Sequence, residues 1–104
     1  MADKFAEDLL AEQQSQADRL IEMFQKIPDL LPTFTLEQTN AYYALMERHD
    51  QWRKTLFEGQ KELLKLTDEK EYTLRKLALL ERDAEKTREA ANALAAIIRN
   101  EIPE

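Results

Sequence analysis

The chain has 104 residues, of which 35% are charged, and it carries a formal net charge of −6 with one glycine, three prolines and no cysteine. This composition excludes a turn-rich β protein, a disulfide framework and any site that needs a thiolate. The negative charge disfavours nucleic-acid binding, because proteins that bind phosphates present an excess of lysine and arginine. Ala, Leu, Glu, Lys, Gln and Arg dominate, and they are good helix formers, so we expect one all-α domain over residues 1–104.

The acidic N-terminus, Met1–Asp8, lacks the basic start and apolar run of a signal peptide. No uninterrupted apolar run is longer than the six residues of Ala93–Ile98, whereas a membrane-spanning helix needs about 20 apolar residues. We therefore expect a cytoplasmic protein that does not insert into a membrane.

The first predicted helix runs from about residue 4 to about residue 27, and its apolar side chains recur on one stripe. The polar segment Gln13–Gln16 interrupts this stripe, so the middle of the helix is expected to pack less tightly. Pro28 is expected to end the helix, because the residue before a proline is disfavoured in helical geometry.

The predicted connector covers residues 28–35. Its apolar residues Leu30, Leu31 and Phe34 are expected to cover the end of the bundle. Thr35 and Gln38 have the spacing of a capping box, which predicts that the second helix starts at Leu36.

A proline-free stretch follows, in which positions spaced alternately by three and four are mostly apolar. The series is Tyr42, Leu45, His49, Trp52, Leu56, Gly59, Leu63, Leu66, Lys70, Thr73, Leu77, Leu80, Ala84, Thr87, Ala91, Leu94 and Ile98. This spacing predicts helix with coiled-coil-like packing.

Three arrangements of this stretch are compatible with the pattern. A turn at residues 67–71 would give arms of about 36–66 and 72–102, and Asp68 and Glu71 have capping-box spacing there. A turn near Gly59 is the second possibility, since glycine suits the end of a helix. The third is an unbroken rod of about 67 residues and near 100 Å. We favour a hairpin that turns at 67–71.

The apolar stripe is wider than a two-stranded coiled coil needs. A second row runs beside the first, formed by Tyr43, Met46, Phe57, Leu64, Leu74, Ala78, Ala90 and Ile97. A stripe of this width contacts two neighbours, which predicts an antiparallel helical hairpin joined by the first helix in a three-helix bundle. A second copy of the chain is the other candidate neighbour. Acids and bases alternate over residues 81–89, which is typical of a solvated helix face.

No residue pattern indicates catalysis, and we expect no enzyme, no cofactor and no metal. Ser15 and His49 are the only serine and histidine, and the Glu-x-x-His pairs of helical metal sites are absent. No glycine-rich phosphate loop is present. His49 is interpreted as a packed residue whose burial disfavours its charged form, so that acid is expected to loosen the second helix.

Two surfaces are candidates for binding a partner protein. The first is the apolar face of the last helix, formed by Ala90, Ala91, Leu94, Ile97 and Ile98. The second is an aromatic and methionine patch that includes Tyr43, Met46 and Phe57. Such residues are enriched in interface cores, but filling of the bundle core is the favoured explanation of this patch.

The segment Leu56–Glu71, followed by Leu77, Leu80, Glu81 and Arg82, resembles the helical core of flagellar export chaperones of the FlgN type. The resemblance covers about a quarter of the chain. It implies a non-catalytic cytoplasmic chaperone that holds a secreted subunit through its C-terminal helix, here about Ala84–Ile102, and a turn at Gly59. The N-terminal helix and its connector have no counterpart in that family.

The most direct functional prediction is a helical protein–protein interaction module, either an adaptor or an export-chaperone-like protein. One alternative is a structural component that assembles with itself, as a homodimer or a larger coiled-coil body. Another is a small inhibitor of phage type that blocks a host protein complex.

Overall fold

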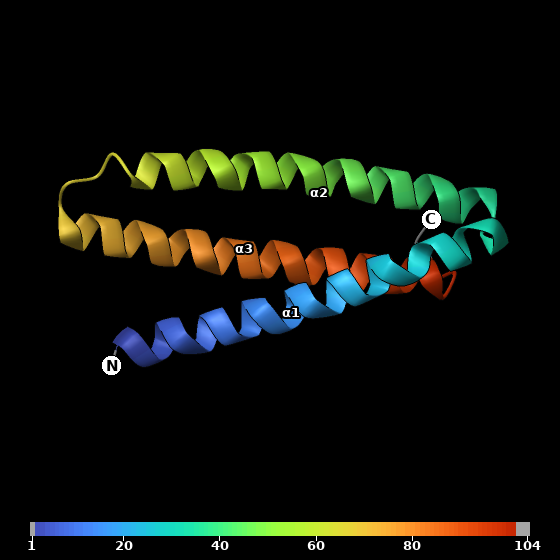
Figure 1. Ribbon diagram of the computed structural model, residues 1–104, viewed down its shortest axis with the longest axis horizontal. Helices are drawn as coiled ribbons and strands as arrows, with labels where there is room; N and C mark the ends of the chain where they lie inside the picture. Colours follow the sequence, from blue (N-terminus) through green and yellow to red (C-terminus); the bar gives the residue numbers. More distant parts are fainter. Residues whose placement is uncertain (1, 102–104) are drawn as a thin grey trace.

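The computed structural model describes residues 2–101, and in this part of the chain it contains three long α-helices, one short 3₁₀ helix and no strand. Helix α1 spans Ala2–Leu30, η1 spans Leu31–Thr33, α2 spans Leu36–Leu63 and α3 spans Glu69–Ile98. Helices α1 and α3 run in the same direction and α2 runs against both (Figure 1). The prediction of an all-α three-helix bundle is confirmed, since α3 packs against both α1 and α2.

The first helix continues past the proline that was expected to end it. Pro28 lies inside the last turn of α1, which ends at Leu30 and leads directly into η1. A proline near a helix end removes only one late hydrogen bond, so the chain tightens into 3₁₀ geometry instead of breaking at Ile27. Leu31 and Phe34 pack against the core, as predicted for the connector.

Helix α2 begins with the predicted capping box. The backbone amide of Gln38 donates to the Thr35 hydroxyl over 3.1 Å, and the backbone amide of Thr35 donates to Gln38 Oε1 over 2.8 Å. The buried Gln38 side chain also donates to the backbone oxygen of Ile97 over 2.8 Å. One residue therefore caps the start of α2 and fastens it to the end of α3.

The hairpin turns at residues 64–68, and neither predicted turn position is correct in full. Gly59 lies inside α2, so the turn near Gly59 is wrong. The turn overlaps the range 67–71 at its first two residues, but α3 already begins at Glu69. The Asp68 side chain accepts from the backbone amides of Lys70 and Glu71 at 2.9 and 3.3 Å, which places the helix start three residues earlier than residue 72.

Helix α3 ends at Ile98, before the predicted limit of residue 102, which lies outside the described residues. Asn100 adopts the left-handed conformation with φ of 57°. Its amide donates to the oxygen of Ile97, and the amide of Glu101 donates to the oxygen of Ala96. These bonds form a Schellman motif, in which asparagine replaces the more usual glycine.

The buried core is concentrated at one end of the molecule, where the connector joins α1 to α2. We call this the closed end, and its core residues are Leu20, Ile27, Leu45, Ala90, Ala91, Leu94 and Ile97. Away from it, α1 follows α3 and diverges from α2 (Figure 1). At the opposite end, which contains the turn, α1 lies on the α3 side of the hairpin and away from α2 (Figure 1).

Candidate functional site

The face of the last helix that was predicted to bind a partner is the core of the bundle. Ala91 and Leu94 are 0% exposed, and Ala90 and Ile97 are buried as well. Ile98 is half-buried and packs against the same cluster. The expectation that this face is open to a partner is therefore wrong, because α1 and the start of α2 cover it.

The second predicted patch is divided along α2. Tyr43 and Phe57 are 58% and 57% exposed, whereas Met46 is half-buried. Tyr43 lies beside Tyr42 at the closed end, with ring centroids 5.6 Å apart. Phe57 lies near the turn, with the Lys61 ammonium 4.8 Å from its ring centroid. These residues are accessible, but the structure does not bring them into one cavity.

The region around the turn contains an unfilled apolar surface. We call residues 53–82 the hairpin tip. Within this range, all of which the structure describes, no side chain is buried, although six of its leucines are half-buried. These six are Leu56, Leu63, Leu66, Leu77, Leu79 and Leu80. The apolar pattern predicted from the sequence is present here, but too few neighbouring side chains cover it.

Two cavities lie end to end between α2 and α3, and Arg82 contributes to both. Their volumes are about 440 and 310 Å³, and no residue of α1 lines either of them. We call the two together the outer groove. Its apolar and small lining residues are Leu45, Trp52, Gly59, Leu63, Ala78, Leu79, Ala90 and Ala93. They recur at helical spacing on both arms, so the outer groove follows the axis of the hairpin.

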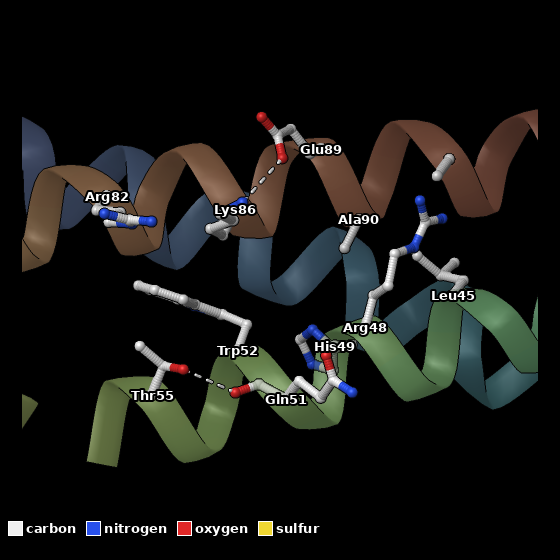
Figure 2. Close-up of a pocket in the computed structure, with 11 residues that line it drawn as sticks. Leu45, Arg48, His49, Gln51, Trp52, Thr55, Arg82, Lys86, Glu89 and Ala90 are labelled. Carbon is white, nitrogen blue, oxygen red and sulfur yellow. Dashed lines mark hydrogen bonds and ion pairs between the residues drawn. The ribbon is translucent and has the colours of Figure 1, made fainter. Parts of the chain in front are cut away.

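Cationic side chains predominate along the outer groove. Trp52 and Arg48 extend from α2 toward α3, and Arg82 and Lys86 lie on the facing wall (Figure 2). The Arg82 guanidinium is 5.7 Å from the centroid of the Trp52 ring. Glu89, the acid in this part of the groove, lies 3.9 Å from the Lys86 ammonium. The groove thus combines an aromatic and aliphatic floor with a positively charged rim.

A third cavity, of about 540 Å³, lies on the other side of the hairpin tip and is bordered by Gln13 of α1. Its lining is mainly aliphatic and aromatic, with Lys61 and Lys76 at the edge. The two lysines lie over the rings of Phe57 and Tyr72 at 4.8 and 5.8 Å. The divergence of α1 from α2 explains this space, because no third helix fills the gap between the arms.

A buried carboxylate joins the three helices where the closed end meets the tip. Asp83 is 7% exposed; it accepts from the Trp52 indole N–H over 2.8 Å and from the side-chain amide of Gln13. The interpretation of the charged residues over 81–89 as a solvated face is therefore wrong at Asp83, whereas the buried Thr87 belongs to the predicted apolar series. Gln13 belongs to the polar interruption in α1, which positions a hydrogen-bond donor opposite Asp83. In the same interruption, Gln16 Oε1 is buried without a partner in the described part of the chain.

His49 borders the outer groove beside Trp52 and is half-buried. Its ring lies 6.1 Å from that of Phe24 at an angle of 41°. Burial, with a smaller contribution from Arg53, holds the pKa of His49 below its usual value of 6.5, while Asp50 and Asp83 act in the opposite direction. A half-buried imidazole against a phenyl ring matches the predicted packing role.

Across the described residues, no group of three or more His, Cys, Asp or Glu side chains is arranged to hold a metal ion. None of the helices in residues 2–101 has the length and apolarity required to cross a membrane.

Sequence reasoning did not identify the outer groove. Leu45, Trp52, Gly59 and Leu63 were assigned to the apolar seam, and Ala78 and Ala90 to the second row beside it. Both rows were expected to be covered by neighbouring helices or by a second copy of the chain. The signal that could have revealed the groove is the number of helices, because α1 is the only further long helix in the described part of the chain and covers one side of the α2–α3 hairpin.

No family model, no curated protein and no solved structure matches this chain. The resemblance to FlgN-type chaperones therefore stays a prediction. The turn at Gly59 that it implied is not present.

Proposed function

We propose that this protein is a non-enzymatic protein–protein interaction module that binds a helical segment of another protein in the outer groove. The observation that supports the proposal is that residues 53–82 form a leucine-rich hairpin in which no side chain is buried. Exposed apolar surface of this kind is uncommon in monomeric proteins unless it serves an interaction. An adaptor or an export-chaperone-like role is compatible with this mode of binding.

The shape of the groove favours a helix as ligand. Gly59 and Ala78 line the same cavity from the two arms of the tip, and Ala90 and Ala93 line the cavity that continues toward the closed end. Small side chains allow a third backbone to approach closely, while Leu63 and Leu79 offer aliphatic surface to its apolar face. Amphipathic helices commonly bind other proteins by placing their apolar face in such a groove.

Site-specific photo-crosslinking in the native cell tests the proposal. A photoreactive residue at Ala78 lies in the outer groove, whereas the same residue at Ala44 lies on an exposed face of α2 outside all three cavities. We expect a discrete adduct with another protein from position 78 only, which is lost when Ala93→Glu is added to narrow the groove. The partner is identified from the purified adduct. Its affinity for the Ala78→Glu and Ala44→Glu variants of this protein is then measured.

The proposal predicts weaker binding for Ala78→Glu and unchanged binding for Ala44→Glu. Adducts of equal yield from both positions would place the interaction elsewhere. Adducts of position 78 with a second copy of this chain alone would favour the self-assembling structural component instead.

A further inference from the structure

We infer that the ligand of the outer groove is an amphipathic helix with acidic side chains along its flanks, bound on the face of the α2–α3 hairpin that α1 leaves uncovered. This inference rests on the proposed function and specifies the chemistry of the partner.

The charges of the hairpin tip differ in sign from those of the whole chain. Residues 53–82 contain eight lysines and arginines against six aspartates and glutamates, a net charge of +2. The chain as a whole has a net charge of −6, so the remaining residues carry −8. Binding at the tip therefore selects for negative charge, although the molecule is acidic overall.

The acids of the outer groove are already paired, whereas two of its arginines are not. Glu62 and Glu89 form ion pairs with Lys65 and Lys86 at 3.1 and 3.9 Å. Arg48 and Arg82 form no ion pair with any residue in the described part of the chain. An incoming carboxylate thus meets unpaired guanidinium groups, to which it can bind through two parallel hydrogen bonds.

The arginines are positioned for the flanks of a helix and not for its buried face. Arg48 belongs to α2, and Arg82 belongs to α3 and lies over the Trp52 ring (Figure 2). A helix on the floor between the two arms has one cationic wall on each side. Its apolar stripe then contacts Trp52 and Leu79, and acidic residues beside the stripe lie next to the arginines.

The length of the groove sets the length of the ligand. On α3 the lining extends from Arg75 to Ala93, which at 1.5 Å per residue is about 27 Å. A helix of about 18 residues, or five turns, covers this distance.

Three synthetic helical peptides of this length test the inference. They carry the same leucine and alanine stripe, contain no tryptophan and differ only in their flanking residues, which are Glu, Gln or Lys. Trp52 is the only tryptophan of the chain and lies in the groove, so its fluorescence reports binding directly. We expect the Glu peptide to bind at least tenfold more tightly than the Lys peptide at low salt. We also expect this difference to shrink as salt is added.

Charge reversal in the groove provides the matched comparison. In the double variant Arg48→Glu/Arg82→Glu, the Lys peptide is expected to bind more tightly than the Glu peptide. The control Lys4→Glu/Lys26→Glu makes the same change in net charge at exposed positions of α1. This control is expected to bind the Glu peptide more tightly than the Lys peptide, as the wild type does. Circular dichroism verifies that both variants remain helical.

The outcomes separate this inference from the function on which it rests. If no peptide changes the Trp52 signal, both the helix-binding function and the inference are wrong. If the peptides bind without a charge preference, or the Lys peptide binds most tightly, the function stands and the acidic ligand is wrong. Self-association in sedimentation equilibrium that Arg48→Glu/Arg82→Glu abolishes would identify a second copy as the occupant and overturn the inference.

Discussion

Asp83 shows how a single polar residue is accommodated inside this bundle. The carboxylate is buried, and it accepts hydrogen bonds from Trp52 of α2 and Gln13 of α1. No ion pair with it is formed in the described part of the chain. Burial of a charge is costly unless hydrogen bonds compensate it, so these two donors are part of what keeps the three helices in register.

Replacement of Trp52 by phenylalanine is expected to lower the free energy of unfolding by about 1–3 kcal/mol, because it leaves a buried acceptor without its donor. Denaturant unfolding followed by circular dichroism measures the change. Tyr43→Phe is the control, because Tyr43 is exposed. This substitution is expected to change the free energy of unfolding by no more than about 0.5 kcal/mol. Equal effects of the two substitutions would show that the bond to Asp83 contributes nothing.

His49 makes the stability of the protein depend on pH. Because burial, then Arg53, lower its pKa in the folded state, the unfolded chain binds a proton more readily than the folded chain does. The stability that the uncharged His49 contributes is therefore fully present above pH 6.5. It is lost as the pH falls from 6.5 through the lower pKa of the folded state. We expect His49→Leu to lose less stability than the wild type between about pH 7.5 and about pH 5.5. Parallel denaturant curves measure this, and an identical loss in both proteins would contradict it.

At the scale of the element, helix ends decide where the hairpin turns. Asp68 caps α3, and the amides of Leu64, Lys65 and Leu66 bond three residues back to end α2. Gly59 lacks any such end signal around it and stays helical. A glycine inside a helix costs only about 1 kcal/mol, which packing of the flanking turns readily offsets.

Gly59→Ala is therefore expected to stabilise the protein by up to about 1 kcal/mol through higher helix propensity. The new Cβ would lie 3.1 Å from Leu79 Cδ1, but Leu79 is half-buried beside two open cavities and can shift. Ala78→Gly, the reverse change on the exposed face of α3, is expected to destabilise by about 1 kcal/mol. Thermal unfolding compares the two, and destabilisation by Gly59→Ala would show that Leu79 cannot move.

The C-terminal part of α3 serves stability first. Leu94→Ala is expected to cost about 2–5 kcal/mol, because Leu94 is fully buried and its removal leaves a cavity. Leu74→Ala, at a position that is 60% exposed, is expected to cost less than about 1 kcal/mol. Denaturant unfolding distinguishes them. A loss for Leu94→Ala no larger than that for Leu74→Ala would mean that this face is uncovered in solution.

At the scale of the whole molecule, one end is closed and the other is open. The bundle measures 52 × 25 × 25 Å, with the core near the connector and half-buried leucines near the turn. The asymmetry arises because α1 follows α3 alone toward the tip. The core and the half-buried leucines thus lie toward opposite ends of the same hairpin.

Small-angle X-ray scattering measures this arrangement in solution. We expect a radius of gyration slightly above the Cα value of 16.4 Å, since bound water and side chains enlarge it. An unbroken helix over the same stretch would reach about 100 Å. A maximum dimension near that length would exclude the hairpin, and a radius that grows with concentration would reveal self-association.

Much of the fold was predictable from local chemistry. Composition and helical spacing predicted the class, and Thr35 with Gln38 predicted the start of α2, because a capping box depends only on neighbouring residues. Asp68 indicated the start of α3 in the same way.

The tertiary structure decided which part of the long apolar stripe is covered. Spacing marks a face of a helix as apolar, but burial depends on a second element lying against it. Ala91, Leu94 and Ile97 are core because α1 and α2 converge on them, whereas Leu63 and Leu79 lie where α1 has diverged from α2 and border open cavities. The same pattern of residues therefore makes core at one end of the molecule and candidate binding surface at the other.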